Sequence, residues 1–388
     1  MKEDFIKASD QLAYMFFQNK VYDLAYRQSE ITLAMEPLNK QIRFNTAKCA
    51  YYANEYNRAI EHINVCLMLD PKNEDAKREL ALYLPWIGET DKAFEIIKSL
   101  PKDDRTMFNM GWYSLMQGDF LGGMKCLNYG RNINCWGSQI KMPTPKWDGS
   151  EGKKVFVYNE GGYGDEIIFA RFLKYIKALN CEVYVRCSKE MESIFKRMDC
   201  VDSITTNNMY PIHDYWIGSM ELPVKLGMKN VSGEPYLSPD SEYVEKWKDK
   251  LDLGDFNIGI RWEGGQLFEH DQRRTLPIDK LVKAIGSKGK LFSLQKDEIS
   301  TPKNINISEI ESFEDTLAII SLMDIVITSC TVTAHLAGSI GKKTIVIVPI
   351  VPYFTWSDPF IWYDSVTILR QVDPLNWDEP IKKLENML

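Results

Sequence analysis

The chain lacks the sequence patterns of the common metal and redox sites. It has eight cysteines in 388 residues but no C-x-x-C pair, and its four histidines form no H-E-x-x-H motif. Structural and catalytic zinc sites are usually built from such clustered ligands, so no protein-bound metal is expected. The cysteines are also too dispersed for a disulfide scaffold, and we expect reduced thiols at Cys49, Cys66, Cys126, Cys135, Cys181, Cys187, Cys200 and Cys330.

Long apolar runs and an excess of positive charge are missing as well. The longest strongly apolar stretch, TIVIVPIVPYF, is too short to span a bilayer, and the charged N-terminal sequence MKEDFIKASD does not resemble a signal peptide. With 47 Lys and Arg against 54 Asp and Glu, the net charge is -7. This charge argues against a protein held to nucleic acid by bulk positive charge. We expect a cytoplasmic protein of two or three domains without a membrane span.

An internal repeat occupies the N-terminal third of the chain. Small residues recur at steps of 34 residues, which is the tetratricopeptide period. They form two sets, twelve residues apart: Ala13, Ala47 and Ala81, then Ala25, Ala59 and Ala93. A proline follows each predicted helix pair: Pro37, Pro71 and Pro101. A fourth, degenerate unit has Gly111 and Gly123 in the two small positions.

Residues 1–138 are therefore predicted to be a tetratricopeptide array of three to four helix pairs. Stacked pairs curve and leave one face open, so such arrays often bind a peptide or a neighbouring subunit. Two roles stay open at this point. The array either binds a protein partner or a second copy of the chain, or it is a structural platform for the next domain.

The remainder of the chain alternates predicted strands and helices. After the linker MPTPKWDGSEG, the segments KKVFVYNE and CEVYVRC are predicted strands, each followed by a helical pattern. A second series runs from FNIGIRW through DIVITS to KKTIVIVP, and the polar stretch SGEPYLSPDSEYVEKWKDKLDLGD is interpreted as the connection. Such alternation indicates parallel sheets covered on both faces. We predict two Rossmann-like halves across a cleft, at residues 150–250 and 251–388.

One stretch that can carry chemistry follows the first predicted strand. In EGGYGD, the glycines Gly161, Gly162 and Gly164 permit a tight turn and the close approach of a ligand to the backbone. Asp165 falls at the start of the following helix. Its alternative role is to cap that helix after the glycine turn.

Two further stretches belong to the second half. In TSCTVTAHLAGSIG, hydroxyls and amides at a predicted helix N-terminus suit an anionic group. His335, one turn into that helix, is either a ligand contact or a hydrogen-bonded structural residue. The stretch RWEGG, which begins at Arg261, is followed by DQRRTLP, where the adjacent Arg273 and Arg274 can clamp phosphate oxygens or form a solvated charge run.

Together these stretches resemble a known family. From about Lys154 to Leu388 the chain resembles the heptosyltransferase-like glycosyltransferases of the GT-B fold, especially bacterial proteins that fuse tetratricopeptide repeats to such a module. The resemblance is carried, in order, by GGYGDEIIFARFL, IGIRWEGG with RRTLP and FSLQK, DIVITSCTVTAHLAGSIGKKTIVIVP, and WYDSVTILRQ. It implies an all-α repeat array followed by an α/β GT-B module, with the acceptor side in the first half and the nucleotide-sugar side in the second.

The resemblance also implies an activity. The chain would be an inverting, metal-independent hexosyl- or heptosyltransferase-like enzyme that moves a sugar from a nucleotide sugar to a hydroxyl on a glycan, protein or nucleic acid. It would need no cofactor besides the donor substrate, in keeping with the lack of any Asp-x-Asp sequence. Asp165 would take the proton from the acceptor hydroxyl. The implied donor-binding residues are Arg261, Arg273, Arg274, Gln295, Lys296, Cys330, Thr331 and His335.

Within that set the resemblance assigns separate tasks. Arg273 and Arg274 would face the diphosphate, and Thr331 would hold phosphate at the helix N-terminus. Gln295 and Lys296 would line the nucleotide pocket. His335 would contact phosphate or sugar, and loops such as 205–220 and 264–272 would shape the pocket.

Two departures from the family pattern leave alternatives open. Relatives usually carry Asp-Thr where this chain has Cys330-Thr331, and commonly a small polar residue where it has Glu263 followed by two glycines. One alternative is a catalytically degenerate repeat scaffold that binds protein partners. Another is transfer to hydroxylated nucleic-acid bases, for which lysines between Lys174 and Lys196 would form a local basic track.

Overall fold

The fold was analysed in a computed structural model of the chain, which describes residues 2–136, 140–207, 209–265, 273–296, 302, 305–306, 309–374 and 376–388. Its elements form two compact units, Met1–Tyr113 and Ser114–Leu388. The finer division at residues 138, 150 and 250 stays a prediction. None of the described helices is both long enough and apolar enough to cross a membrane.

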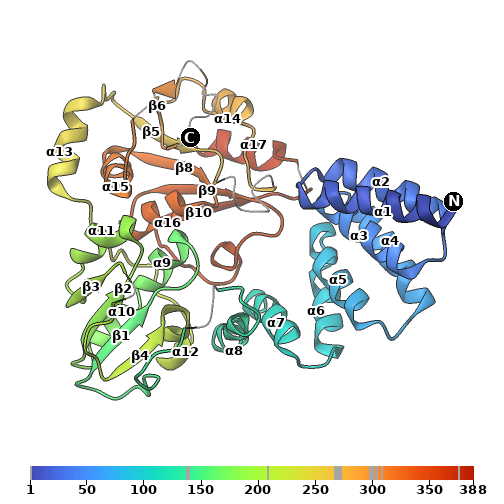
Figure 1. Cartoon of the computed structure of the whole chain (residues 1–388). Coiled ribbons are helices and arrows are strands. Elements are labelled where there is room, and N and C mark those ends of the chain that lie inside the picture. Colours follow the sequence, from blue (N-terminus) through green and yellow to red (C-terminus); the bar gives the residue numbers. More distant parts are fainter. Residues whose placement is uncertain are drawn as a thin grey trace. The chain divides into compact units, whose positions relative to one another are not determined.

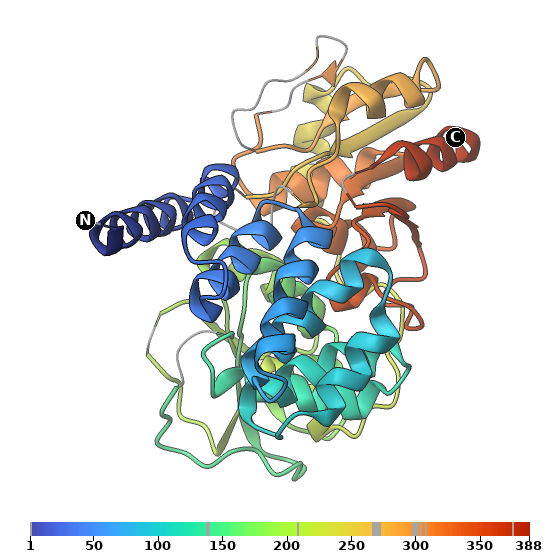
Figure 2. The ribbon, with the colours of Figure 1, turned by 90° about the vertical axis from the view of Figure 1, so that its right-hand side faces the viewer.

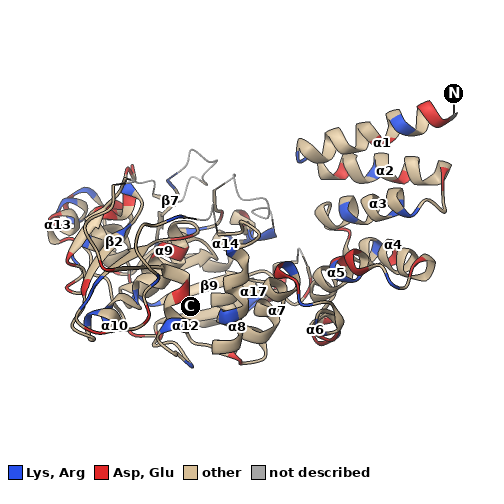
Figure 3. Cartoon of the chain, turned by 60° about the horizontal axis from the view of Figure 1, so that its bottom comes forward, with Lys and Arg blue, Asp and Glu red and all other residues tan. Residues whose placement is uncertain are grey.

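The first unit is built from antiparallel helix pairs (Figures 1 and 2). The helices are α1 (Lys2–Gln18), α2 (Tyr22–Met35), α3 (Lys40–Tyr52), α4 (Tyr56–Leu69), α5 (Glu74–Tyr83), α6 (Thr90–Ser99) and the start of α7 (Asp104–Met116). All six alanines of the repeat are at most 3% exposed, because they lie where helices touch. The predicted tetratricopeptide array is thereby confirmed. Basic and acidic side chains are interspersed along its helices (Figure 3).

The degenerate fourth repeat also forms a pair of helices, α7 and α8 (Phe120–Leu127). At Gly123 on α8, a Cβ atom would lie 2.6 Å from Cγ of Leu115 on α7. No real side chain fits at that distance, so glycine is required where the two helices meet. The small residue that the repeat pattern predicted at this position therefore has a steric cause.

The first sheet of the second unit is wholly parallel, with strand order β3-β2-β1-β4. Its strands are β1 (Lys154–Tyr158), β2 (Glu182–Arg186), β3 (Ser203–Thr205) and β4 (Tyr215–Gly218). Its helices are α9 (Tyr163–Ala170), α10 (Leu173–Lys177), α11 (Glu192–Lys196) and α12 (Leu222–Lys225). Residues 205–220 were expected to be a loop, and this was wrong because β4 lies within them and pairs with β1.

The second sheet is also parallel, with strand order β10-β9-β8-β5-β6-β7. Its strands are β5 (Asn257–Arg261), β6 (Lys290–Ser293), β7 (Ile305–Asn306), β8 (Ile325–Ser329), β9 (Thr344–Val348) and β10 (Val366–Arg370). Its helices include α14 (Ile278–Ile285), α15 (Phe313–Leu322), α16 (Val332–Ser339) and α17 (Asp378–Met387). The predicted pair of Rossmann-like halves is confirmed, and the order reverses between β5 and β8, where such sheets bind ligands.

The polar stretch 232–255 is more than a connection. It contains helix α13 (Ser241–Lys250), which packs on α15. The indole of Trp247 is buried there and donates a hydrogen bond of 2.8 Å to Oδ1 of Asp315. One tryptophan thus anchors a helix whose other residues are mostly polar.

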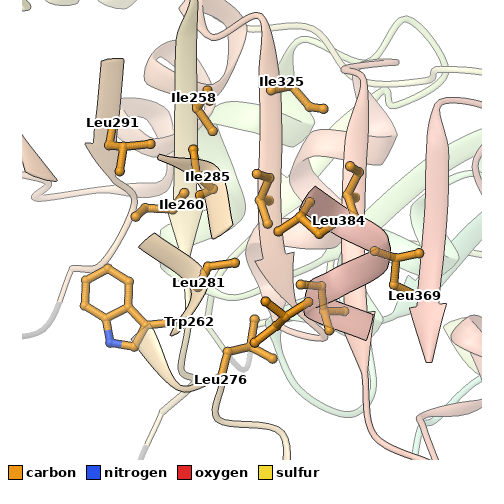
Figure 4. Packing of buried hydrophobic residues seen from close by; sticks show 14 of the residues in the cluster. Ile258, Ile260, Trp262, Leu276, Leu281, Ile285, Leu291, Ile325, Leu369 and Leu384 are labelled. Atoms are coloured by element: carbon orange, nitrogen blue, oxygen red, sulfur yellow. The ribbon is translucent and has the colours of Figure 1, made fainter. Parts of the chain in front are cut away.

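One face of the second sheet is covered by α14 and α17, which bury a cluster of aliphatic side chains against β5 and β8 (Figure 4). Ile258 and Ile260 from β5 meet Ile285 from α14 in this cluster. The strands are short apolar runs because both of their faces are buried. This core holds the carboxyl ends of β5 and β8 in fixed register.

We expect the Ile285→Ala variant to lose about 2–5 kcal/mol of unfolding free energy, because it leaves a cavity in this cluster. Ile285 is fully buried. The matched control is Ile212→Ala, since Ile212 is 92% exposed and should contribute less than about 0.5 kcal/mol. Urea unfolding followed by circular dichroism measures both. Equal midpoint shifts in the two variants would contradict the packing described here.

Candidate active site

The glycine turn between β1 and α9 fixes Asp165. Gly161 has φ +78°, and a Cβ atom there would lie 2.4 Å from Oδ2 of Asp165, so only glycine fits. Oδ2 of Asp165 accepts a hydrogen bond of 2.9 Å from the backbone N–H of Gly162. Asp165 therefore caps the first turn of α9, as the alternative role predicted, although it stands inside the helix rather than before it. Capping occupies only one of its two oxygens.

The other oxygen of Asp165 faces the second half. Oδ1 accepts a hydrogen bond of 2.6 Å from the hydroxyl of Tyr353, which follows β9. Loss of hydration raises the pKa of Asp165, while the hydrogen bonds from Tyr353 and Gly162 lower it, and the net direction is upward. A carboxylate with a raised pKa is a stronger base, which suits proton abstraction from a hydroxyl.

The start of α16 gathers hydroxyl groups at the end of β8. Thr331 is the buried N-cap residue, with its hydroxyl 3.4 Å from that of Thr328. The hydroxyl oxygens of Ser329 and Thr333 are buried and have no hydrogen-bond partner among the described residues. Unsatisfied donors beside the amides of a helix N-terminus suit a phosphate group. Sequence reasoning named Thr331 but not Ser329 or Thr333, although all three belong to the same run of hydroxyl residues.

His335 lies one turn further along α16 and is enclosed by aromatic rings. Its ring stacks on Trp356 with centroids 4.7 Å apart, and its Nδ1 lies 3.0 Å from the hydroxyl of Tyr363. Burial, together with the positive charges of Arg171 and Arg274, lowers the pKa of His335 to about 3. The imidazole is therefore neutral at physiological pH and acts as a hydrogen-bonding group, not as a cation.

The arginines of the second half have different environments. Arg274 donates a hydrogen bond of 3.0 Å from Nη1 to the carbonyl of Cys330, which brings the RRTLP stretch to the start of α16. Arg261 instead donates to the carbonyls of Leu294 (2.9 Å) and Glu263 (3.2 Å), so it braces the ends of β5 and β6. Arg273 and Cys330 are both buried. Asp271 and Gln272 of the same motif lie outside the described residues.

Gln295 and Lys296 follow β6. Gln295 is buried, its Oε1 accepts a long hydrogen bond of 3.4 Å from the N–H of Glu263, and its Nε2 has no partner among the described residues. Lys296 is exposed. The ends of β5, β6 and β8 thus bring Arg261, Gln295 and Thr331 to one edge of the sheet.

The two halves meet where α9 packs against α16. A Cβ atom at Gly164 would lie 3.2 Å from Cδ2 of His335, so glycine allows the close approach. A second link is the bidentate ion pair between Arg197 and Glu314, at 2.6 and 2.7 Å. No group of three or more His, Cys, Asp or Glu among the described residues is placed to hold a metal ion.

We predict that the imidazole of His335 does not titrate between pH 5 and pH 8. Because its pKa is lowered in the folded chain but returns to the ordinary value of about 6.5 on unfolding, acid should progressively destabilise the fold below that value. Histidine NMR resonances, with His335 assigned from a His335→Gln variant, test this directly. A His335 resonance that shifts with a midpoint near pH 6.5 would contradict its enclosure.

No family model matches the chain. Over 275 residues the chain is 22% identical to Protein FlbA of Caulobacter vibrioides; the match covers 59% of this chain and 45% of FlbA, so the chain spans less than half of that relative. In structure it is similar to a Thermobaculum terrenum O-GlcNAc transferase mutant, at 12% identity and a TM-score of 0.37, covering 100% of this chain and 90% of that one.

It is also similar to E. coli ADP-heptose LPS heptosyltransferase II, at 11% identity and a TM-score of 0.45, covering 60% of this chain and 97% of that one. Similarities at this level do not assign an activity. The fold rests on the chain's own helix pairs and strand orders, which are those of a tetratricopeptide array followed by an α/β unit of two Rossmann-like halves.

Proposed function

We propose that this chain is a glycosyltransferase that moves a sugar from a nucleotide-sugar donor to an acceptor hydroxyl. The observation that supports this most is the meeting of α9 and α16, each of which begins at the carboxyl end of a parallel sheet. Asp165 follows Gly164 on α9, and Gly164 approaches His335 on α16 closely, so the proposed base lies on the helix that contacts the proposed donor-binding helix.

The donor diphosphate would bind at the start of α16. There the amides of the helix, the unpartnered hydroxyls of Ser329 and Thr333 and the guanidinium of Arg274 supply donors and positive charge. The same groups would stabilise the negative charge that develops on the leaving diphosphate. We therefore propose that transfer needs no metal ion. The buried Nε2 of Gln295, with the neighbouring Lys296, would face the nucleotide.

The chemical step would be a direct displacement. The acceptor oxygen attacks the anomeric carbon from the face opposite the diphosphate, and Asp165 takes the proton from that oxygen. The bond between the anomeric carbon and the diphosphate oxygen breaks, and its electron pair leaves with the diphosphate. The configuration at the anomeric carbon is therefore inverted. Neutral His335 would donate or accept a hydrogen bond without adding charge.

The repeat array would serve acceptor or partner recognition. The proposed acceptor is any molecule with a suitable hydroxyl, whether glycan, protein or nucleic acid. Failure of the chain to bind nucleotide sugars would instead favour a repeat scaffold that has lost catalysis.

We expect Arg274→Ala to weaken donor binding roughly tenfold to hundredfold, because a charge-assisted contact to phosphate is lost. Calorimetric titration with nucleoside diphosphates and a panel of nucleotide sugars, with and without magnesium, measures the dissociation constant. Arg58→Ala is the control, since the Arg58 side chain is 62% exposed in the repeat array. An unchanged dissociation constant in Arg274→Ala would show that this arginine does not contribute to donor binding. Absence of binding by the wild-type chain would overturn the proposed function.

Asp165→Asn should lower kcat roughly 10²–10⁴-fold while it leaves the donor dissociation constant within a few-fold, because the amide keeps the shape of the side chain but cannot take the proton. An assay of sugar transfer to a hydroxyl acceptor measures kcat, and calorimetry with the donor measures the dissociation constant. Asp199→Asn, at an exposed position of the same half, is the matched control. Full turnover in Asp165→Asn would exclude Asp165 as the base.

A further inference from the structure

Tyr353 joins the two halves at the proposed base. It lies in the loop between β9 and the short 3-10 helix Phe354–Trp356, and its hydroxyl donates the 2.6 Å hydrogen bond to Oδ1 of Asp165. The next residue, Phe354, holds the loop in place. The centroid of its ring lies 6.5 Å from that of Phe169 on α9 and 5.6 Å from that of Trp362. The phenol therefore reaches the carboxylate from a fixed loop.

The carboxylate of Asp165 is held by two donors from different halves. Gly162 of the first half binds Oδ2, and Tyr353 of the second half binds Oδ1. Each carboxylate oxygen has a second lone pair, so the two hydrogen bonds fix the orientation of the group without using up its capacity to accept a proton. If the Tyr353 bond were removed, only Gly162 would restrain the carboxylate.

We infer that Tyr353 is a positioning residue for Asp165, which directs the carboxylate toward the acceptor hydroxyl when the two halves are together. The inference rests on the proposed function, in which Asp165 is the base. In this inference a residue of the second half, Tyr353, orients the proposed base of the first half. The bond couples the geometry of the base to the contact between the halves, because Asp165 lies in the first turn of α9 and Tyr353 lies in the loop after β9.

Few other titratable groups surround Asp165. From α16, His335 touches the adjacent Gly164 and is neutral. On α9 itself, Glu166 faces Ser188. Among the described residues no ion pair reaches Asp165, and the phenol of Tyr353 stays protonated because burial and the nearby carboxylate raise its pKa. The hydrogen bond from Tyr353 thus lowers the pKa of Asp165, and its removal should raise that pKa.

The test is the pH dependence of transfer by Tyr353→Phe, which keeps the ring and removes the hydroxyl. Because Asp165 must be ionised to act, a raised pKa moves the acid limb of kcat/KM to higher pH, by about one to two pH units. We also expect kcat to fall at neutral pH while donor affinity stays unchanged. Tyr236→Phe is the matched control: its hydroxyl also binds α9, but through the carbonyl of Ile167 at 2.7 Å, so the acid limb should not move.

A second measurement does not depend on turnover. The unfolding midpoints of Tyr353→Phe, Asp165→Ala and the double variant should be non-additive, since all three lack the hydrogen bond between these two side chains. Additive midpoints and an unmoved acid limb, in a chain that transfers sugar, would overturn the inference and leave the proposed function standing. Non-additive midpoints in a chain that transfers no sugar would overturn the proposed function and reduce the bond to a structural link.

Discussion

The close approach of α9 and α16 is the constraint on which the arrangement of the candidate site depends. Each helix starts at the carboxyl end of a parallel strand, so each directs its free amides toward the same region. A Cβ atom at position 164 would crowd the ring of His335, and glycine avoids this contact. The glycine turn leads into α9, the hydroxyl residues lead into α16 and the buried histidine lies on α16, so all three belong to the segments that this contact joins.

Buried positive charge is the second feature that organises this region. Arg171 is 3% exposed, and its guanidinium donates to the carbonyls of Ser232 and Trp362 and lies over the ring of Tyr363. Among the described residues it forms no ion pair. Burial first, and then the positive charges of Arg171 and Arg274, lower the pKa of His335, because these charges oppose a positive charge on the imidazole. Carbonyls and aromatic faces satisfy Arg171 without cancelling its charge.

The helix pairs, most of the strands and the residues at the strand ends could be predicted from the sequence, because their signals are local. Alanines at a fixed period fix the helix pairs, and apolar runs followed by glycine or hydroxyl residues fix strands and their carboxyl ends. The two elements that the sequence did not predict, β4 and α13, also have local causes. Strand β4 is four residues long and has no periodicity to detect, and α13 depends on one buried indole, Trp247. The contact of Asp165 with Tyr353 spans 188 residues of chain, and only the folded topology reveals it.

The way Arg274 is held bears on which residues position 330 can accept. The guanidinium binds the backbone carbonyl of residue 330, and every amino acid supplies that carbonyl. A substitution of Cys330 therefore keeps the acceptor of this hydrogen bond, while it changes the side chain that precedes α16. The side chain at position 330 can thus vary without loss of the contact that brings the RRTLP stretch to the start of α16.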